Sequence, residues 1–589
     1  MGKMKTTRKR SARKKTPAPS SLTLRLHAPG MTLLHRAGLG GLAATLKAME
    51  RRHKLGRLRD EQLPLGPDLG NRYPWRVEPT SITLDWGEPT AAGEYLRELF
   101  AFAFGIKDKL IDLPGTYRDE LSRAVRAELQ HGLMLTFLQH GGTRTVGDPS
   151  VQFVNPTSDG LSQVAFDWRP CAYYKHQDGA NKLTTSAGTL KQTVLKIEGP
   201  LYPGAAERHS EPKLSHRTKV EEPPERAIPL YFAMIGCLSL PIRRSVGVLL
   251  VPSVTDLAMF ARARPRMTPT SSRECRIAGL GDAALQAMVR LRGTRMISRH
   301  GKSTIGHMYG MRLAPQAWDK KQKYRDATID FLPLRDDAAE DRRLRRFELA
   351  LSHLPRSVSP HEWDREHEVG RGRDAKNKRK VVKIKTSEHI WYDSVVRPLA
   401  ADNLSRGRRW YDGFARLVGN REMTRRVGYE TKGLRAMADE PELLDDEEME
   451  FIRALHHAIA IGLGRIYAEM GRPPKGPNGR YPVGLTNRWD RFRERVRLAL
   501  IGAKTRSQTQ EAISVVLARA GIPAELRDAQ ALRRLKDLVF GDDWRRVRDL
   551  ALFALASYKK PADMKELPAD TEGFEESEAE TQPSPETEE

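Results

Sequence analysis

The chain has 589 residues, with 100 Lys or Arg against 75 Asp or Glu, so its formal net charge is +25. This length predicts two to four domains. The three cysteines lie far apart without CxxC spacing, which argues against a disulfide framework or a zinc ribbon. No segment reaches the ~20 uninterrupted apolar residues of a membrane span, and no signal-peptide core follows the basic start. We expect a cytoplasmic protein whose folded part, which is strongly basic, binds nucleic acid. The alternative is that the surface charge serves only solubility.

The two ends of the chain have opposite charge. Residues 1–15 carry eight Lys or Arg and no acid, whereas residues 563–589 carry eleven Asp or Glu against one Lys. The acidic end has too little apolar surface to bury, so it is not expected to fold. We predict a disordered basic tail over residues 1–20 and a disordered acidic tail over residues 561–589.

A strand, a turn and a glycine-containing helix are predicted after the basic tail. Residues 22–26 alternate leucine with polar side chains, which indicates a half-buried strand, and Pro29–Gly30 turns the chain. Thr32 is a suitable N-cap for a helix that continues to Leu46. Three glycines inside this helix each cost about 1 kcal/mol relative to alanine. A strand or a nucleic-acid backbone is therefore expected to pass close to them.

The rest of the front half mixes strand and helix signals, so residues 21–360 predict a mixed α/β region. A hairpin is expected from two strands at 73–77 and 82–86. Further helices are expected at 92–104, 120–139, 254–262 and 282–292, and further strands at 151–154, 164–168, 193–197 and 246–251. Residues 201–226 are rich in Pro, Glu, His and Lys, which favours an exposed loop.

The composition changes at His361, where core residues almost disappear until Val381. Residues 361–386 therefore predict a basic linker or a loop near a phosphate backbone, with candidate contacts at Arg371, Arg373, Lys376 and Lys378. Helical spacing then dominates, so residues 387–560 predict a helical bundle. The expected fold class is α+β: a mixed α/β N-terminal region followed by a C-terminal α-helical bundle.

Three further places combine cations as a phosphate-binding surface would. Residues 295–303 offer a glycine turn with cations and hydroxyl groups, although an ordinary basic hairpin is an equal alternative. A helix near residue 490 carries arginines at i, i+3 and i+7, and such a stripe can follow a phosphate backbone. Arg408 and Arg409 add charge to the same helical region. Taken singly, the stripe and this pair could each be an ordinary solvated helix face. The candidate contacts are Arg299, His300, Lys302, Ser303, Arg408, Arg409, Arg488, Arg491 and Arg495.

No catalytic set is complete. Residues 301–303 read GKS, but position 296 is methionine where a P-loop needs glycine. Residues 38–43 satisfy GxGxxA inside a helix, whereas a dinucleotide needs the first glycine at the strand-to-helix turn. A cluster between 361 and 367 suggests a metal-dependent nuclease, but it lacks an apolar framework to hold ligands: His361, Asp364, Glu366 and His367. We predict no enzymatic activity, no cofactor and no metal, and keep that nuclease as the alternative.

Two short runs that contain aromatic residues or histidines can be interpreted as structural or as functional. Residues 173–176 combine tyrosines with cations, as a base-stacking surface does, or form a strand edge. His456 and His457 point about 100° apart on a helix, so they cannot share one metal, and one of them is expected to be a packing residue.

Residues 29–42 read PGMTLLHRAGLGGL and resemble the N-terminus of the large subunit of type I CRISPR effector complexes (Cascade), in the Myxan branch related to subtype I-B. The close match covers about 25 residues around this run. The resemblance implies a non-catalytic subunit that binds target DNA, recognises the protospacer-adjacent motif and aids strand separation in antiviral defence. Residues 21–360 would then bind the flanking motif and the complex, and the bundle would resemble a small subunit.

The resemblance also implies partners: guide RNA, target double-stranded DNA, the Cascade backbone, guide-5′-end and guide-processing subunits, and a nuclease-helicase recruited after target binding. A separate small subunit from an internal start, at Met437 or Met449, is a further expectation. A nucleic-acid-binding scaffold outside CRISPR systems is the remaining alternative.

Overall fold

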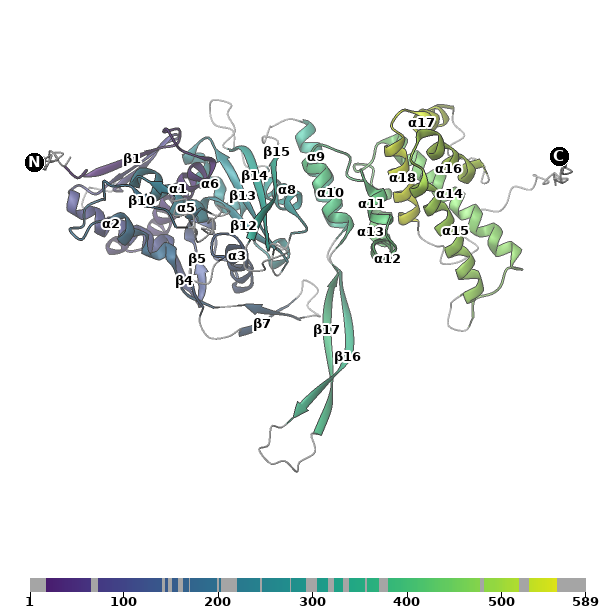
Figure 1. Ribbon diagram of the computed structural model, residues 1–589, viewed down its shortest axis with the longest axis horizontal. Helices are drawn as coiled ribbons and strands as arrows, with labels where there is room; N and C mark the ends of the chain where they lie inside the picture. The colour runs from purple at the N-terminus through teal and green to yellow at the C-terminus, as the bar shows by residue number, and fades with distance from the viewer. Residues whose placement is uncertain are drawn as a thin grey trace, which may run out of the picture. The chain divides into compact units, whose positions relative to one another are not determined.

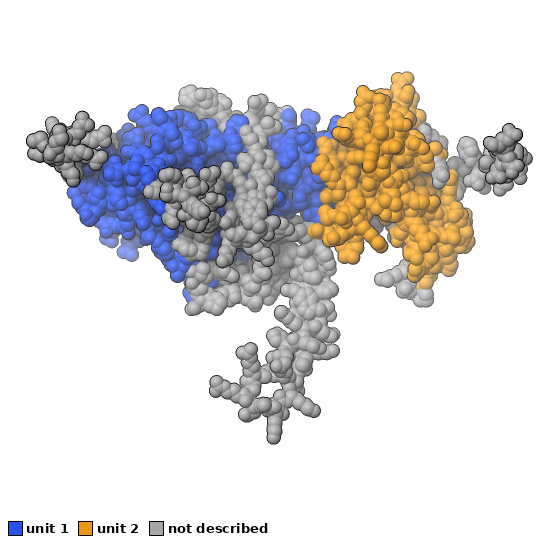
Figure 2. All heavy atoms as spheres, in the orientation of Figure 1, with its two compact units in different colours: residues 1–351, 355–410 blue, residues 352–354, 411–589 orange. Residues whose placement is uncertain are grey.

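The computed structural model forms two compact units, which Figure 2 colours separately. Unit 1 comprises residues 1–351 and 355–410, and unit 2 comprises residues 352–354 and 411–589. The strands of the described residues belong to unit 1, and the elements described in unit 2 are helices, which confirms the α+β class. The structure describes residues 17–64, 73–139, 144–146, 151–156, 163–168, 170–198, 201–202, 220–243, 246–275, 277–292, 305–315, 323–331, 338–354, 357–369, 380–392, 394–476, 481–518 and 529–558.

Unit 1 begins with a three-stranded antiparallel sheet. In this sheet β3 (Ser81–Asp85) lies between β1 (Ser21–Arg25) and β2 (Trp75–Val77). The predicted hairpin is therefore confirmed, and so is the alternation in β1, where the leucines are buried and their neighbours exposed. Gly30 turns the chain with φ +83°, a conformation that favours glycine. The helix α1 (Leu33–Lys54) follows with Thr32 as its N-cap, as predicted.

The glycines of α1 allow a second helix to approach closely. Figure 1 shows α1 within unit 1, where it packs against α5 (Pro224–Gly236). A Cβ atom added at Gly38 would lie 1.8 Å from the Pro229 carbonyl oxygen, and one added at Gly236 would lie 1.8 Å from the Ala37 carbonyl oxygen. The expected close approach is confirmed. The neighbour, however, is a helix of the same chain and not a strand or a nucleic acid.

A second antiparallel sheet supports this helix pair. Its strand order is β12 (Leu238–Arg243), β13 (Val246–Val254), β14 (Ile305–Pro315) and β15 (Lys323–Phe331). The strand predicted at 246–251 is confirmed as β13, nearly every residue of which is buried, and α1 packs on it. Short paired strands complete the β structure: β4 (Gly105–Lys107), β5 (Leu110–Asp112), β6 (Arg144–Val146), β7 (Val151–Pro156), β8 (Gln163–Trp168), β9 (Cys171–Tyr174), β10 (Leu195–Lys196) and β11 (Glu221–Glu222).

The predicted helices of the front half correspond to α2, α3, α6 and α8. The helices up to residue 405, beyond α1 and α5, are α2 (Ala92–Ala103), α3 (Arg123–Leu135), α4 (Gly179–Leu183), α6 (Leu257–Met267), α7 (Ser272–Cys275), α8 (Leu280–Leu291), α9 (Ala338–His353) and α10 (Val396–Ser405). In the part of the chain that the structure describes, no helix has the length and apolar content needed to cross a membrane.

The segment expected as a basic linker, residues 361–386, is a β-hairpin in its described parts. β16 (Ser357–Val369) and β17 (Lys380–Tyr392) pair antiparallel along their whole length. The register sets Asp364 opposite Lys385 and Glu366 opposite Lys383. This pairing joins two stretches that are not neighbours in the sequence, so local composition does not reveal it.

Unit 2 is a helical bundle, as predicted. The helices α14 and α18 pack on each other and on most of the others. The unit's helices from Tyr411 onward are α11 (Phe414–Val418), α12 (Arg421–Tyr429), α13 (Thr431–Ala438), α14 (Asp446–Glu469), α15 (Val483–Gly502), α16 (Arg506–Ala518), α17 (Ala529–Phe540) and α18 (Trp544–Ser557).

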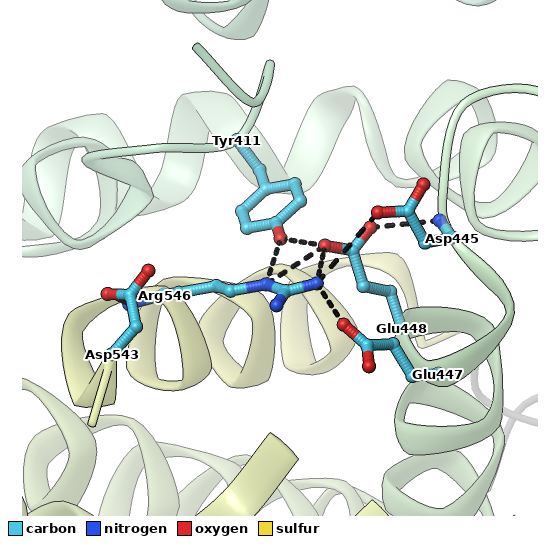
Figure 3. Close-up of polar contacts among 6 residues, drawn as sticks. All are labelled: Tyr411, Asp445, Glu447, Glu448, Asp543 and Arg546. Carbon is cyan, nitrogen blue, oxygen red and sulfur yellow. Dashed lines mark hydrogen bonds and ion pairs between the residues drawn. The ribbon is translucent and has the colours of Figure 1, made fainter. Parts of the chain in front are cut away.

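A buried polar cluster fastens the start of α14 to α18 (Figure 3). The Arg546 guanidinium donates hydrogen bonds to Glu448 at 2.6 Å and to Glu447 at 2.5 Å. Glu448 is only 2% exposed, and it also accepts from the Tyr411 hydroxyl and from the Asp445 backbone N–H. Burial and the adjacent Glu448 carboxylate raise the pKa of Tyr411, so this phenol stays protonated as a donor. Because a buried carboxylate needs partners, Glu448 ties these segments together.

Candidate nucleic-acid interface

A groove of about 1820 Å³ runs between α12 and α15 in unit 2, with the end of α14 at its side. Arg488, Arg491 and Arg495 of α15 line it, together with Arg421 and Arg425 of α12. All five side chains belong to exposed residues. The three-arginine stripe predicted from the sequence therefore lines a hollow surface, which two arginines of α12 also line.

The packing of α15 explains why its arginines share one face. Leu485 and Trp489 are buried in a cluster with residues of α14 and α18, and the Trp489 indole N–H donates to the Leu463 carbonyl oxygen at 3.1 Å. Because a helix that buries one stripe exposes the opposite one, positions 488, 491 and 495 are left toward solvent. The aromatic core thus orients the stripe.

The helix α12 supplies the arginines that the sequence analysis missed. Asn420 caps this helix by accepting from the Glu422 backbone N–H at 2.8 Å, and Val427 is its only buried residue. Arg421 and Arg425 are four positions apart, so they lie on one face. An asparagine cap followed by two arginines at this spacing is the sequence signal that would have identified them.

Acidic side chains also line the groove, and one of them is already paired. Arg497 forms an ion pair with Glu494 at 2.5 Å, and its hydrogen bond lowers the pKa of that carboxyl group, as does the charge of Arg421. Glu422, Glu469 and Asp490 complete the acidic lining. Among the described residues, none of the five arginines forms an ion pair. Guanidinium groups that form no such ion pair can bind phosphate or carboxylate in a bidentate manner.

The other predicted contacts do not join this groove. Arg408 and Arg409 follow α10 in unit 1, whereas the groove is lined by residues of unit 2. Arg408 is exposed and Arg409 partly buried. The remaining candidates lie outside the described residues and stay predictions: Arg299, His300, Lys302, Ser303, Arg371, Arg373, Lys376 and Lys378.

Two of the four residues in the run at 173–176 belong to the core, whereas Tyr173 and Lys175 are partly exposed. Tyr174 and His176 are fully buried, and burial lowers the pKa of His176 to about 3. His456 is likewise a packing residue, as predicted: its Nε2 lies 2.9 Å from the Ala554 carbonyl oxygen, and burial lowers its pKa to about 4.

The cluster between 361 and 367 falls on β16. Successive positions of a strand belong to opposite faces, so positions 361 and 367 share one face and positions 364 and 366 the other. Within the described ranges, no three His, Cys, Asp or Glu residues gather as a metal site requires.

Comparison with known proteins covers almost the whole chain. The family model of the DevT N-terminal domain matches residues 23–231, and that of the DevT C-terminal domain matches residues 439–588. The chain is also 32% identical over 577 residues to the CRISPR-associated protein Cas8a1/Csx13 of Myxococcus xanthus (strain DK1622), which covers 93% of this chain and 90% of that protein. The helix α15 lies inside the C-terminal match, whereas α12 precedes it.

Proposed function

Because the chain belongs to the family of the CRISPR-associated protein Cas8a1/Csx13, the Myxan-type large subunits of Cascade, we propose that it binds target DNA without catalysing a reaction. The family membership confirms the resemblance noted at residues 29–42. Recognition of the protospacer-adjacent motif and help in separating the strands complete the proposed role. In such complexes the protein recognises a short sequence in the flanking duplex, and base pairing with the guide RNA recognises the remainder of the target.

The groove of unit 2 is the observation that carries the DNA-binding proposal. Arg488 to Arg495 spans about 10 Å of helix axis at 1.5 Å per residue. One strand of B-DNA presents a phosphate about every 3.4 Å of duplex axis, so a stripe of this length that lies along the axis would pass about three phosphates. Arg421 and Arg425 face the same hollow and add contacts from the opposite wall. We place a stretch of nucleic-acid backbone between α12 and α15.

The remaining parts of the proposal concern partners and motif reading. The expected partners are the guide RNA, the other Cascade subunits and a nuclease-helicase, in the cytoplasm. We assign contacts with the flanking duplex to Arg299 and Lys302 and their neighbours, and to the cations between β16 and β17.

A small subunit from an internal start is more compatible with Met437 than with Met449. A chain that starts at Met437 keeps Glu447 and Glu448, the acids that pair with Arg546. A start at Met449 removes both and leaves Arg546 without these carboxylates. Immunoblotting against the C-terminal helices tests the idea, since a single full-length band would exclude it.

Binding of a target duplex by the assembled complex tests the proposed function. The triple variant Arg488→Gln, Arg491→Gln, Arg495→Gln should weaken binding. The matched control is Arg453→Gln, Arg533→Gln, Lys536→Gln, which removes the same charge from exposed residues of α14 and α17 that do not line the groove. Equal affinity of the two variants would contradict the groove assignment. With randomised flanks, Arg299→Ala with Lys302→Ala should alter the flank preference, and an unchanged preference would remove those residues from the proposal.

A further inference from the structure

We propose that the acidic C-terminal segment of this chain, residues 563–589, occupies the groove between α12 and α15 when no nucleic acid is bound, and so competes with nucleic acid for it. The inference rests on the proposed function, since it takes the groove as a phosphate-binding surface. It adds an internal ligand that would restrain binding of non-target nucleic acid.

Charge complementarity is the first reason. Residues 563–589 carry eleven Asp or Glu and one Lys. The groove presents five arginines that form no ion pair with the described acids. Guanidinium groups bind carboxylates in the same bidentate geometry as phosphates. A surface that suits a phosphate backbone therefore also suits a run of carboxylates.

The place where the described chain ends is the second reason. Tyr558, just after α18, is buried in one cluster with Leu485 and Trp489 of α15. The Arg493 guanidinium of α15 donates to the Leu555 carbonyl oxygen at 3.0 Å. The last turn of α18 thus packs on the inner face of the helix whose outer face forms one wall of the groove.

The distance from that point to the groove is short. An α-helix with its side chains is about 10–12 Å across. The chain has to pass around α15 and not through it, a path of about 17 Å at this diameter. The six residues after Tyr558 span about 20 Å when extended, so all but the first residues of the acidic segment can reach the arginines. A ligand on so short a tether has an effective concentration in the millimolar range. Even weak contacts between carboxylates and arginines would then fill the groove for much of the time.

The direct test compares the full chain with a variant that ends at residue 562. A second variant keeps the length but changes the eleven acids of residues 563–589 to Asn or Gln. Binding of a labelled single-stranded oligonucleotide of mixed sequence is measured by fluorescence anisotropy at low salt. Both variants should bind roughly tenfold more tightly than the full chain, because they lack the tethered competitor. Unchanged affinity in both would overturn the inference.

Groove variants separate this inference from the proposed function. With Arg488→Gln, Arg491→Gln and Arg495→Gln present, removing the acidic segment should give no gain in affinity. If these changes weaken binding but truncation has no effect in either background, the groove stands and the acidic segment is not its ligand. If they leave binding unchanged even in the truncated chain, the groove assignment itself fails.

A second competitor for the acidic segment is the basic segment of residues 1–15. In a chain without residues 1–15, the affinity ratio between truncated and untruncated C-termini should stay the same. A ratio that falls to one would show that the acidic segment pairs with residues 1–15 instead of the groove, and would overturn the inference.

Discussion

The contact between α1 and α5 predicts that one substitution, glycine to alanine, has opposite effects at two helical positions. In a helix interior, alanine is favoured over glycine by about 1 kcal/mol. At Gly38, however, the new Cβ would lie 1.8 Å from the Pro229 carbonyl oxygen and 2.7 Å from its carbon. Ordinary contacts between such atoms need about 3.5–4.0 Å, so the helices must move apart. Overpacking costs about 1–3 kcal/mol, and a backbone neighbour cannot rotate away.

We therefore expect Gly38→Ala to lower the free energy of unfolding of unit 1 by about 2 kcal/mol or more, after the gain in helix propensity. The control is Gly428→Ala in α12, where a Cβ would meet nothing within 4 Å, so stability there should rise by up to about 1 kcal/mol. Hydrogen exchange of peptides from α1 and α12 measures the two effects separately. If the amides of α1 were as well protected from exchange in Gly38→Ala as in the wild type, the close helix contact would be refuted.

Two further predictions concern buried polar groups. Arg546→Met leaves the Glu448 carboxylate buried without its cation, so it should lower the free energy of unfolding, measured with denaturant, by about 3–5 kcal/mol. Adding Glu448→Leu should restore most of that loss. If Arg546→Met alone were as stable as wild type, the stabilising role of the cluster would be refuted. His176 has a folded-state pKa of about 3, so the unfolded state binds its proton first as pH falls below about 6.5. Stability should therefore fall between about pH 6.5 and pH 3, by at most about 1.4 kcal/mol per pH unit from this group. His176→Phe should flatten that part of the profile, and an unchanged slope would contradict the assignment.

Elements with local signals could be predicted from the sequence. The strand, turn and N-cap at residues 21–33 each depend on neighbouring residues. The helices α2, α3 and the bundle helices from α14 onward follow hydrophobic periodicity, and β13 follows a continuous apolar run. The helix α5 was not predicted because residues 224–236 are apolar on nearly all sides and contain prolines, so no period of 3.6 stands out. The hairpin of β16 and β17 was not predicted because its pairing joins two segments that are not neighbours in the sequence, so no local pattern indicates it.

Only one part of the candidate site could be predicted from the sequence. The arginine stripe of α15 follows from spacing against a buried aromatic face. The groove does not, because it depends on α12, which is held by the single buried side chain of Val427 and meets α15 only in the fold. The glycines of α1 show the same limit: the sequence predicts a close neighbour, and only the tertiary structure identifies it as α5.

The salt dependence of target-duplex binding by the assembled complex tests the central claim most directly. The slope of log K against log salt concentration counts phosphate contacts, at about 0.9 per contact for B-DNA and about 0.7 for a single strand. Changing Arg488, Arg491 and Arg495 to glutamine should reduce the slope by about 2–3, while the control at Arg453, Arg533 and Lys536 should leave it unchanged. The same slope in wild type and groove variant would contradict the assignment of a nucleic-acid backbone to the groove.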